Sequence, residues 1–306
     1  MPGLLPIFTV LLASTLLAVW SGWGLARLAL PPSLQPYKGM LAPLLGYSLV
    51  LVAGYYGVHD LASLPIVLMV LLPITGLFNM LAWRRTGPPR LPTDWWEYGP
   101  LALLLLVTLL VGVLPLLSYG YSGVIGEGWD VEAYFPLTRW LERAPYNLMA
   151  SAPANVTWSI SSERYTIGLT LGFSIWHGCV DLLSRVEALL SFAPVLAWLR
   201  ALGVLAVYVL FRSTLGLRAP FALLGAALVS AGGLLLWVTL YNFGMQLSAW
   251  PLIPLGLVVG IAAVQDGVER GLAAWPSLLL AAVCLVAQPV AYYPALTVFI
   301  PLAVGL

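Results

Sequence analysis

The chain has 306 residues, of which 61% are hydrophobic and 8% are charged, and its formal net charge is +1. Ordinary soluble domains carry about 25% charged residues, so this composition excludes a water-soluble globular protein. The low net charge argues against a nucleic-acid partner, whose binding needs a basic surface. The two cysteines, Cys179 and Cys284, lie far apart and indicate neither a disulfide framework nor a zinc site. We therefore expect the lipid bilayer to be the main partner of this chain.

Long apolar runs recur along the chain, and each approaches the roughly 20 residues that an α-helix needs to cross a bilayer. The eight runs are Leu4 to Gly22, Met40 to Val58, Leu61 to Trp83, Leu101 to Leu117, Ala188 to Phe211, Ala219 to Tyr241, Ala249 to Gln265 and Leu272 to Ala291. Only the fifth contains a charge, at Arg200. Because backbone groups in hydrocarbon must bond one another, such runs predict helices. Gly256 and Gly260 form a small-xxx-small pair that predicts close helix packing.

A ninth apolar run begins near Pro294 and is still apolar at Leu306. It is too short to span a membrane, so we expect the chain to be a fragment of a longer protein. The predicted fold class is an all-α, polytopic transmembrane protein with about eight spans and a truncated ninth. A long outer loop with amphipathic juxtamembrane helices is expected between the fourth and fifth spans.

The basic residues predict which side of the membrane each loop occupies. We take the turn that holds Arg27 and Lys38 as cytoplasmic and let the chain alternate sides at each run. The basic residues of the other short turns then also fall inside, as the positive-inside rule requires: Arg84, Arg85, Arg90, Arg212, Arg218 and Arg270. This places residues 119–187 on the outer face of a plasma (cell inner) membrane. The apolar stretch from Ile167 to Val180 has 14 residues, and we expect it to lie along that face because it is too short to cross.

Most of the side chains that could take part in a reaction lie in the outer loop, where Glu127, Asp130 and Glu132 follow a glycine-rich turn. Three carboxylates at one membrane surface are candidates for acid/base catalysis or for binding a metal ion. Asp130 is also placed like the N-cap of a short amphipathic helix. The spacing alone favours the simpler interpretation, in which Asp130 and Glu132 cap this helix and complement its dipole. The polar face of the helix, expected to point to water or headgroups, holds Arg139, Glu142 and Arg143.

A second group consists of His177, Asp181 and Arg185, which recur at intervals of four. This spacing predicts that they share one face of a helix that runs into the fifth span. Arg185 would then lie at the outer interface. There it either holds a lipid phosphate through charge-assisted hydrogen bonds or acts as an interfacial anchor paired with Asp181 or Glu187.

The order of these features resembles the GT-C integral-membrane glycosyltransferases, which include aminoarabinose transferases and protein O-mannosyltransferases. In that family the first large outer loop carries an Asp-Glu or Asp-x-Asp type motif, and this chain has Asp130-Val131-Glu132 with Tyr134 in GWDVEAYFPLTRWL. The stretches IGLTLGFSIWHGCVDLLSRVEALL, where Gly178 precedes Arg185, and VYVLFRSTLGLRAPFALLGAAL are also similar to the family. The resemblance covers about Leu101 to Leu306. It implies an N-terminal three-span module at 1–99 and an incomplete GT-C-like core at 100–306, with the outer catalytic loop at 119–187.

The resemblance implies a transferase that passes a sugar from a polyprenyl-phosphate-linked donor to a glycan, lipid or protein acceptor on the outer face. Asp130 would be the general base for the acceptor hydroxyl, or Asp130 and Glu132 would together hold a divalent cation such as Mg or Mn. The Asp-x-Glu spacing leaves open which acid is catalytic. Arg185 would stabilise the leaving lipid phosphate. The further candidates for substrate contact are Glu127, Tyr134, Arg139 and His177.

Two other classes of function stay open. A transporter or lipid flippase needs polar groups or broken helices near the membrane midplane, and the spans contain few such groups, chiefly Arg200, Gln246 and Gln288. A non-catalytic membrane assembly subunit would use the outer loop only to dock a partner. The concentration of charge in that loop favours surface chemistry over a conduit, whereas the assembly subunit stays an open alternative.

Overall fold

The computed structural model describes residues 4–88, 95–119, 130–151, 171–240 and 243–305, and these residues form helices and no strand. The α-helices are α1 (Leu4–Leu28), α2 (Lys38–Asp60), α3 (Leu64–Thr86), α4 (Trp95–Tyr119), α5 (Asp130–Leu141), α7 (Gly172–Ser184), α8 (Ala188–Ser213), α9 (Ala219–Ala231), α10 (Gly233–Leu240), α11 (Gly244–Ala249), α12 (Leu252–Arg270), α13 (Trp275–Tyr292) and α14 (Leu296–Gly305). Short 3₁₀ helices lie at Pro32–Tyr37, Tyr146–Ser151, Gly271–Ala274 and Tyr293–Ala295.

Within the described residues, five helical stretches are long and apolar enough to cross a membrane: Leu4–Leu28, Pro32–Asp60, Leu64–Thr86, Ala188–Ser213 and Gly244–Val304. The pair α9 and α10 adds a sixth if it forms one span, although its two halves meet at a bend of 51°. Each of the eight apolar runs in the sequence overlaps an α-helix or a pair of α-helices, but the fourth run lies in α4, whose apolar part Tyr98–Leu114 is shorter than these candidate spans. The predicted all-α membrane protein is therefore confirmed, while the number of spans stays a prediction.

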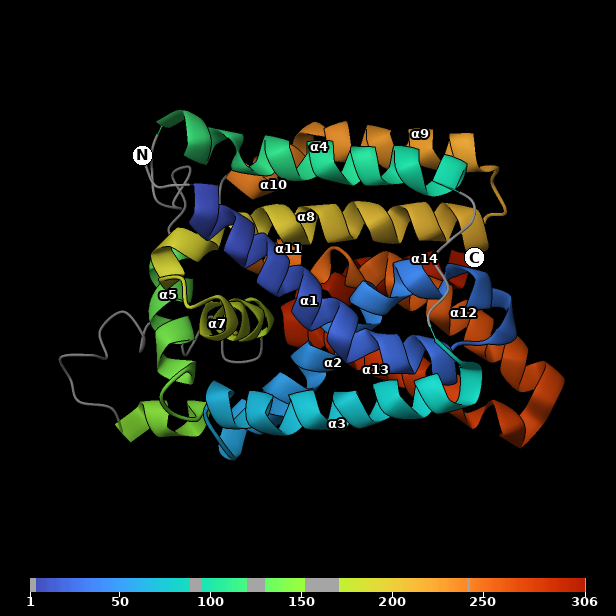
Figure 1. Cartoon of the computed structure of the whole chain (residues 1–306), viewed down its shortest axis with the longest axis horizontal. Coiled ribbons are helices and arrows are strands. Elements are labelled where there is room, and N and C mark those ends of the chain that lie inside the picture. Colours follow the sequence, from blue (N-terminus) through green and yellow to red (C-terminus); the bar gives the residue numbers. More distant parts are fainter. Residues whose placement is uncertain (1–3, 89–94, 120–129, 152–170, 241–242, 306) are drawn as a thin grey trace.

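The long helices lie side by side, and the short helices α5 and α7 cross them at one end (Figure 1). In this view α3, α4 and α8 run from side to side, whereas α7 is seen nearly end-on. The helices α1, α3, α8 and α12 each carry arginine in the last turn and end at the side opposite α5 and α7. Basic residues thus gather at one end of the bundle. By the positive-inside rule that end is the cytoplasmic one, which stays a prediction.

The helix α8 occupies the centre of the bundle, where it packs against α1, α4, α9 and α12. All of its residues from Ser191 to Val209 are buried. By contrast, α1 and α3 expose large apolar side chains along one side, among them Phe8, Leu16, Met69 and Trp83. An apolar surface of this extent is stable only when hydrocarbon covers it, which is the reason that the chain needs a bilayer.

The glycine pair singled out in the sequence contributes to packing at one of its two positions. A Cβ atom added at Gly256 would lie 2.2 Å from Nε2 of Gln288 in α13, so this glycine does permit a close helix contact. A Cβ atom at Gly260 would meet nothing within 4 Å. The closest backbone approach instead joins α1 and α2 at Gly22 and Gly46.

An aromatic cluster connects the first helices to the later ones. The ring of Tyr47 in α2 contacts that of Trp176 in α7 edge-on, with centroids 4.9 Å apart, and Trp176 stacks on Trp198 of α8 at the same separation. The Tyr47 hydroxyl donates a hydrogen bond to the Ser248 carbonyl, at 2.8 Å. Trp198 Nε1 donates to Thr15 Oγ1 of α1 at 3.1 Å. The helices before residue 99 thus share one core with later helices, and the predicted division at that residue stays a prediction.

The variant Tyr47→Phe should be destabilised by about 1 to 3 kcal/mol, because it leaves the buried Ser248 carbonyl without this donor. The melting temperature of the purified protein in detergent measures the effect. Tyr56→Phe is the matched control, since Tyr56 is 61% exposed. Equal melting temperatures for the two variants would contradict the prediction.

Candidate functional site

The predicted amphipathic helix in the outer loop is present as α5, which begins at Asp130. Glu127 lies outside the described residues, and for Asp130 and Glu132 the structure describes the helical backbone but not the side chains. These two positions are two apart in a helix, a spacing that does not bring residues to one face. Asp130 and Tyr134, four apart, share a face of α5.

Tyr134 is 2% exposed, and its side chain packs between α7, α8 and α11. Its ring lies 5.0 Å from the ring of Phe173 and 6.4 Å from that of Phe192, measured between centroids. The Tyr134 hydroxyl accepts a hydrogen bond from the backbone N–H of Met245 at 3.4 Å. The side chain proposed for substrate contact therefore fastens the first turns of α5 to the bundle.

Arg185 lies at the end of α7 and has a conformation that L-residues rarely adopt. Its φ of 56° and ψ of 25° are left-handed, and it is the only described non-glycine residue with positive φ. Its backbone N–H bonds to the Asp181 carbonyl at 2.8 Å, and α7 stops at Ser184. The prediction that Arg185 continues one helix face with His177 and Asp181 is wrong, because the left-handed residue ends the helix before α8 begins. Its side chain is exposed.

His177 and Asp181 do share one face of α7, and both are buried at its contact with α8. Nε2 of His177 lies 2.8 Å from Ser191 Oγ and 3.1 Å from the Ala188 carbonyl oxygen. Ser191 Oγ donates a short hydrogen bond to Asp181 Oδ1. Because a carbonyl only accepts hydrogen bonds, we assign the imidazole hydrogen to Nε2. The other ring nitrogen, Nδ1, then accepts from Thr138 Oγ1 of α5 at 3.4 Å.

Burial changes the protonation of this cluster. It raises the pKa of Asp181 from 3.8 to about 7, an effect that the Ser191 hydrogen bond partly offsets. It lowers the pKa of His177 from 6.5 to about 4, chiefly because the imidazolium would lose its hydration. Asp181 Oδ2 is buried and has no hydrogen-bond partner among the described residues. His177 therefore favours its neutral form near neutral pH, where the Asp181 carboxyl is about half protonated.

Glu142, expected to face water, is largely buried at the side of this cluster. Its side chain is 10% exposed, and its Oε2 accepts a hydrogen bond from Arg139 Nη1 at 3.0 Å. Burial raises the pKa of Glu142, while the adjacent Arg139 guanidinium opposes that rise. The expectation is wrong for Glu142 because α5 packs against α7, and the Glu142 stem reaches the α7 backbone at Gly178. Arg139 is partly exposed and its guanidinium lies over the Phe135 ring.

The structure thus brings three helices together through one buried polar network. Thr138, His177, Asp181 and Ser191 join α5, α7 and α8 at the end of the bundle where Arg185 lies. Sequence reasoning found His177 and Asp181 from their spacing but missed Ser191 and Thr138, which come from neighbouring helices and carry no periodic signal. No group of three or more His, Cys, Asp or Glu side chains in the described part of the chain is arranged to hold a metal ion. The network is buried, and its hydrogen bonds join α5, α7 and α8 to one another.

An apolar groove of about 550 Å³ is bordered by the last residues of α7. It runs along α1, and its other borders are Leu72 of α3 and Leu183 and Ser184 of α7. Thr9, Leu12 and Leu16 of α1 line its length. Arg185, which is exposed, is thus the next residue in the chain after two residues that border a groove with apolar walls.

Comparison with known proteins finds no family model, no curated protein and no solved structure that matches the chain. The fold itself defines the class as an all-α membrane protein whose apolar helices form a bundle, with short crossing helices and a buried polar network at one end.

Proposed function

We propose that the chain is a membrane glycosyltransferase that takes a sugar from a polyprenyl-phosphate-linked donor and passes it to an acceptor on the outer face. One observation carries the proposal: Arg185, whose side chain is exposed, comes directly after Leu183 and Ser184, which border the apolar groove. A lipid-linked donor has an isoprenoid chain that an apolar groove accommodates and a phosphate that a guanidinium binds through paired hydrogen bonds. The left-handed backbone of Arg185 adds support, because such strain is concentrated at functional sites.

The remaining roles follow the sequence interpretation. Asp130, at the first position of α5, acts as general base for the acceptor hydroxyl. Glu132 lies two positions on, which favours a separate role over a cation held by both carboxylates from one helix face. The buried network of Thr138, His177, Asp181 and Ser191 holds α5 against α7 and α8, and so sets the position of Asp130 relative to Arg185. The acceptor is a glycan, lipid or protein.

Membranes that contain the full-length protein, supplied with radiolabelled polyprenyl-phosphate sugars, test the proposal. Asp130→Asn is expected to lower transfer by about 10²- to 10⁴-fold, the usual contribution of a general base. Arg185→Gly is expected to lower transfer by about 10²-fold or more, because the charge on the leaving phosphate loses its partner. Glycine accepts the left-handed backbone without strain, so this variant loses the guanidinium and keeps the helix end.

Arg143→Gly is the matched control, since Arg143 is exposed and follows the end of α5 without bordering the groove. It should transfer sugar at the wild-type rate. Chelation of divalent cations in the same assay should leave transfer unchanged if Asp130 acts as a base, and should abolish transfer if the two carboxylates hold a cation. Wild-type transfer in both Asp130→Asn and Arg185→Gly would overturn the site assignment.

A transporter is the second candidate, and the bend between α9 and α10 favours it. Arg200 of α8 is 2% exposed, and its Nη2 donates to the Ser230 carbonyl beside that bend. Nε and Nη1 of Arg200 are buried without hydrogen-bond partners. A buried cation at a broken helix is typical of substrate sites in transporters. Uptake into vesicles that is lost in Arg200→Gln, together with absent sugar transfer in the wild type, would favour this class.

A further inference from the structure

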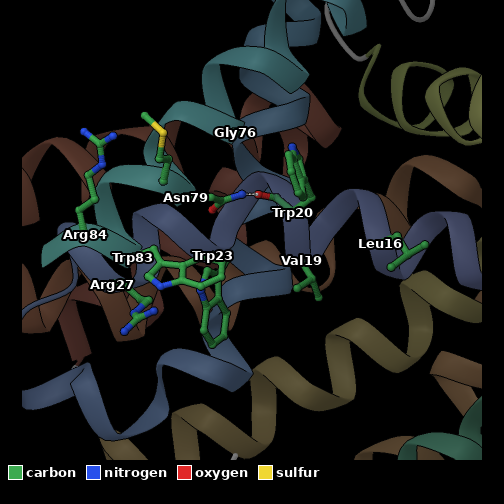
Figure 2. Close-up of a pocket in the computed structure, with 10 residues that line it drawn as sticks. Leu16, Val19, Trp20, Trp23, Arg27, Gly76, Asn79, Trp83 and Arg84 are labelled. Carbon is green, nitrogen blue, oxygen red and sulfur yellow. Dashed lines mark hydrogen bonds between the residues drawn. The ribbon is translucent and has the colours of Figure 1, made fainter. Parts of the chain in front are cut away.

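A second apolar groove lies between α1 and α3, towards the end of the bundle where both helices end (Figure 2). Its volume is about 640 Å³, within the range of about 300 to 1,000 Å³ that is usual for ligand sites. Trp20 and Trp23 of α1 and Trp83 of α3 form most of its walls. Gly76 leaves space opposite Trp20, because a Cβ atom there would approach the Trp20 ring to 3.2 Å.

Two basic residues lie at one end of this groove, on either side of Trp83 (Figure 2). Arg84 is exposed in the last turn of α3, and no described residue forms a hydrogen bond or ion pair with its side chain. Arg27 is 8% exposed, and its Nη2 donates to the Thr86 carbonyl at 3.0 Å while Nε has no partner. No acidic residue is among the described residues that line the groove. The charge at this end of the groove is therefore not neutralised by its lining.

Asn79 adds a polar group within the apolar wall. Its Nδ2 donates to the Trp20 carbonyl at 2.9 Å, as Figure 2 shows, while its Oδ1 has no partner. The groove thus combines tryptophan walls, one amide oxygen available as an acceptor, and two guanidinium groups at the level where α1 and α3 end. Apolar walls disfavour a free soluble anion, whereas a lipid supplies both an apolar chain and a charged headgroup.

We propose that this groove binds one anionic phospholipid, with an acyl chain along Trp20 and Gly76 and the phosphate at the exposed Arg84, while the buried Arg27 adds positive charge to that end of the groove. Basic pockets between membrane helices bind anionic headgroups in this way. Tryptophan at the membrane interface suits the boundary between chain and headgroup. This groove shares Leu16 and Trp20 with the groove that Leu183 and Ser184 border, but its basic residues lie at the opposite end of the bundle from Arg185. The phosphate contact at Arg84 therefore does not depend on the proposed transferase activity.

Native mass spectrometry of the purified full chain tests the proposal, with an equimolar mixture of phosphatidylglycerol and phosphatidylcholine that have the same acyl chains. The wild type should retain one phosphatidylglycerol in preference to phosphatidylcholine. Arg84→Gln should weaken that retention by about fivefold, the effect of removing one basic residue from an anionic lipid contact. Gly76→Leu should also weaken it, because the new side chain occupies the groove.

Arg85→Gln is the matched control, because Arg85 is exposed, adjoins Arg84 and does not line the groove. It should change retention by less than twofold. Equal losses in Arg84→Gln and Arg85→Gln would overturn the proposal, since they would reflect surface charge alone. Equal retention of the two lipids by the wild type would also overturn it, as would a dimer that forms through this face without bound lipid.

Discussion

Replacing Gly46 by alanine is expected to destabilise the protein by about 3 kcal/mol or more, the largest effect of any single added methyl group considered. A Cβ atom at Gly46 would lie 1.8 Å from the Ala18 carbonyl oxygen and 2.7 Å from the Gly22 backbone nitrogen. A Cβ atom at Gly22 would likewise lie 1.9 Å from the Ala42 carbonyl oxygen. Because these atoms belong to the backbone, α1 and α2 must move apart, and overpacking of this kind cannot be relieved by a rotamer change.

The melting temperature and the fraction of monodisperse protein in detergent measure the effect of Gly46→Ala. Gly260→Ala is the matched control, since it adds the same methyl group to a helix where nothing lies within 4 Å. There the higher helix propensity of alanine should leave stability unchanged or raise it slightly. The close approach of α1 and α2 would be contradicted if the two variants melted at the same temperature.

Asp181→Asn and His177→Gln are expected to respond to pH with opposite signs. The pKa of Asp181 is raised in the folded state to about 7, so its contribution to stability is present below about pH 4 and is lost as the pH rises through 7. The pKa of His177 is lowered to about 4, so its contribution is present above pH 6.5 and is lost as the pH falls through 4. In the wild type the two effects largely cancel between pH 4 and 7.

Each substitution removes the pH dependence of one group, so the opposite pH dependence of the other group is no longer cancelled. Asp181→Asn should lose up to about 3 kcal/mol of stability on acidification from pH 7 to pH 4, and His177→Gln should gain up to about 4 kcal/mol, at 1.36 kcal/mol per pKa unit. Melting temperatures across this range, referred to the wild type, provide the test. Asp60→Asn is the control, because the Asp60 side chain is 62% exposed. Parallel pH profiles for the two cluster variants would show that the groups are not buried together.

The helices could be predicted well, because an apolar run in a bilayer has one way to satisfy its backbone. The run from Ala219 to Tyr241 differs from its prediction as one helix. Its hydrophobicity is continuous, yet the structure divides it into α9 and α10 at Gly232. The bend falls at the adjacent glycines Gly232 and Gly233, a usual place for a kink. The Arg200 guanidinium also donates to the Ser230 carbonyl beside it. Composition carries no signal of that contact.

The candidate site could be predicted in part. The interval of four between His177 and Asp181 placed them on one helix face, as the structure confirms. The same interval failed for Arg185, because a single left-handed residue breaks the periodicity and leaves no mark in hydrophobicity. The amphipathic pattern predicts that Glu142 faces water, and the packing of α5 against α7 overrides that tendency.

The composition is enough to identify an all-α membrane protein, since a chain with 61% hydrophobic and 8% charged residues can bury its apolar surface only in hydrocarbon. Which polar groups are enclosed and which stay available depends on how the helices pack. Ser191 and Thr138 meet His177 only because α5, α7 and α8 converge, whereas Arg185 is exposed at the same end. Such contacts join residues far apart in the chain, and local patterns of hydrophobicity and charge do not encode them.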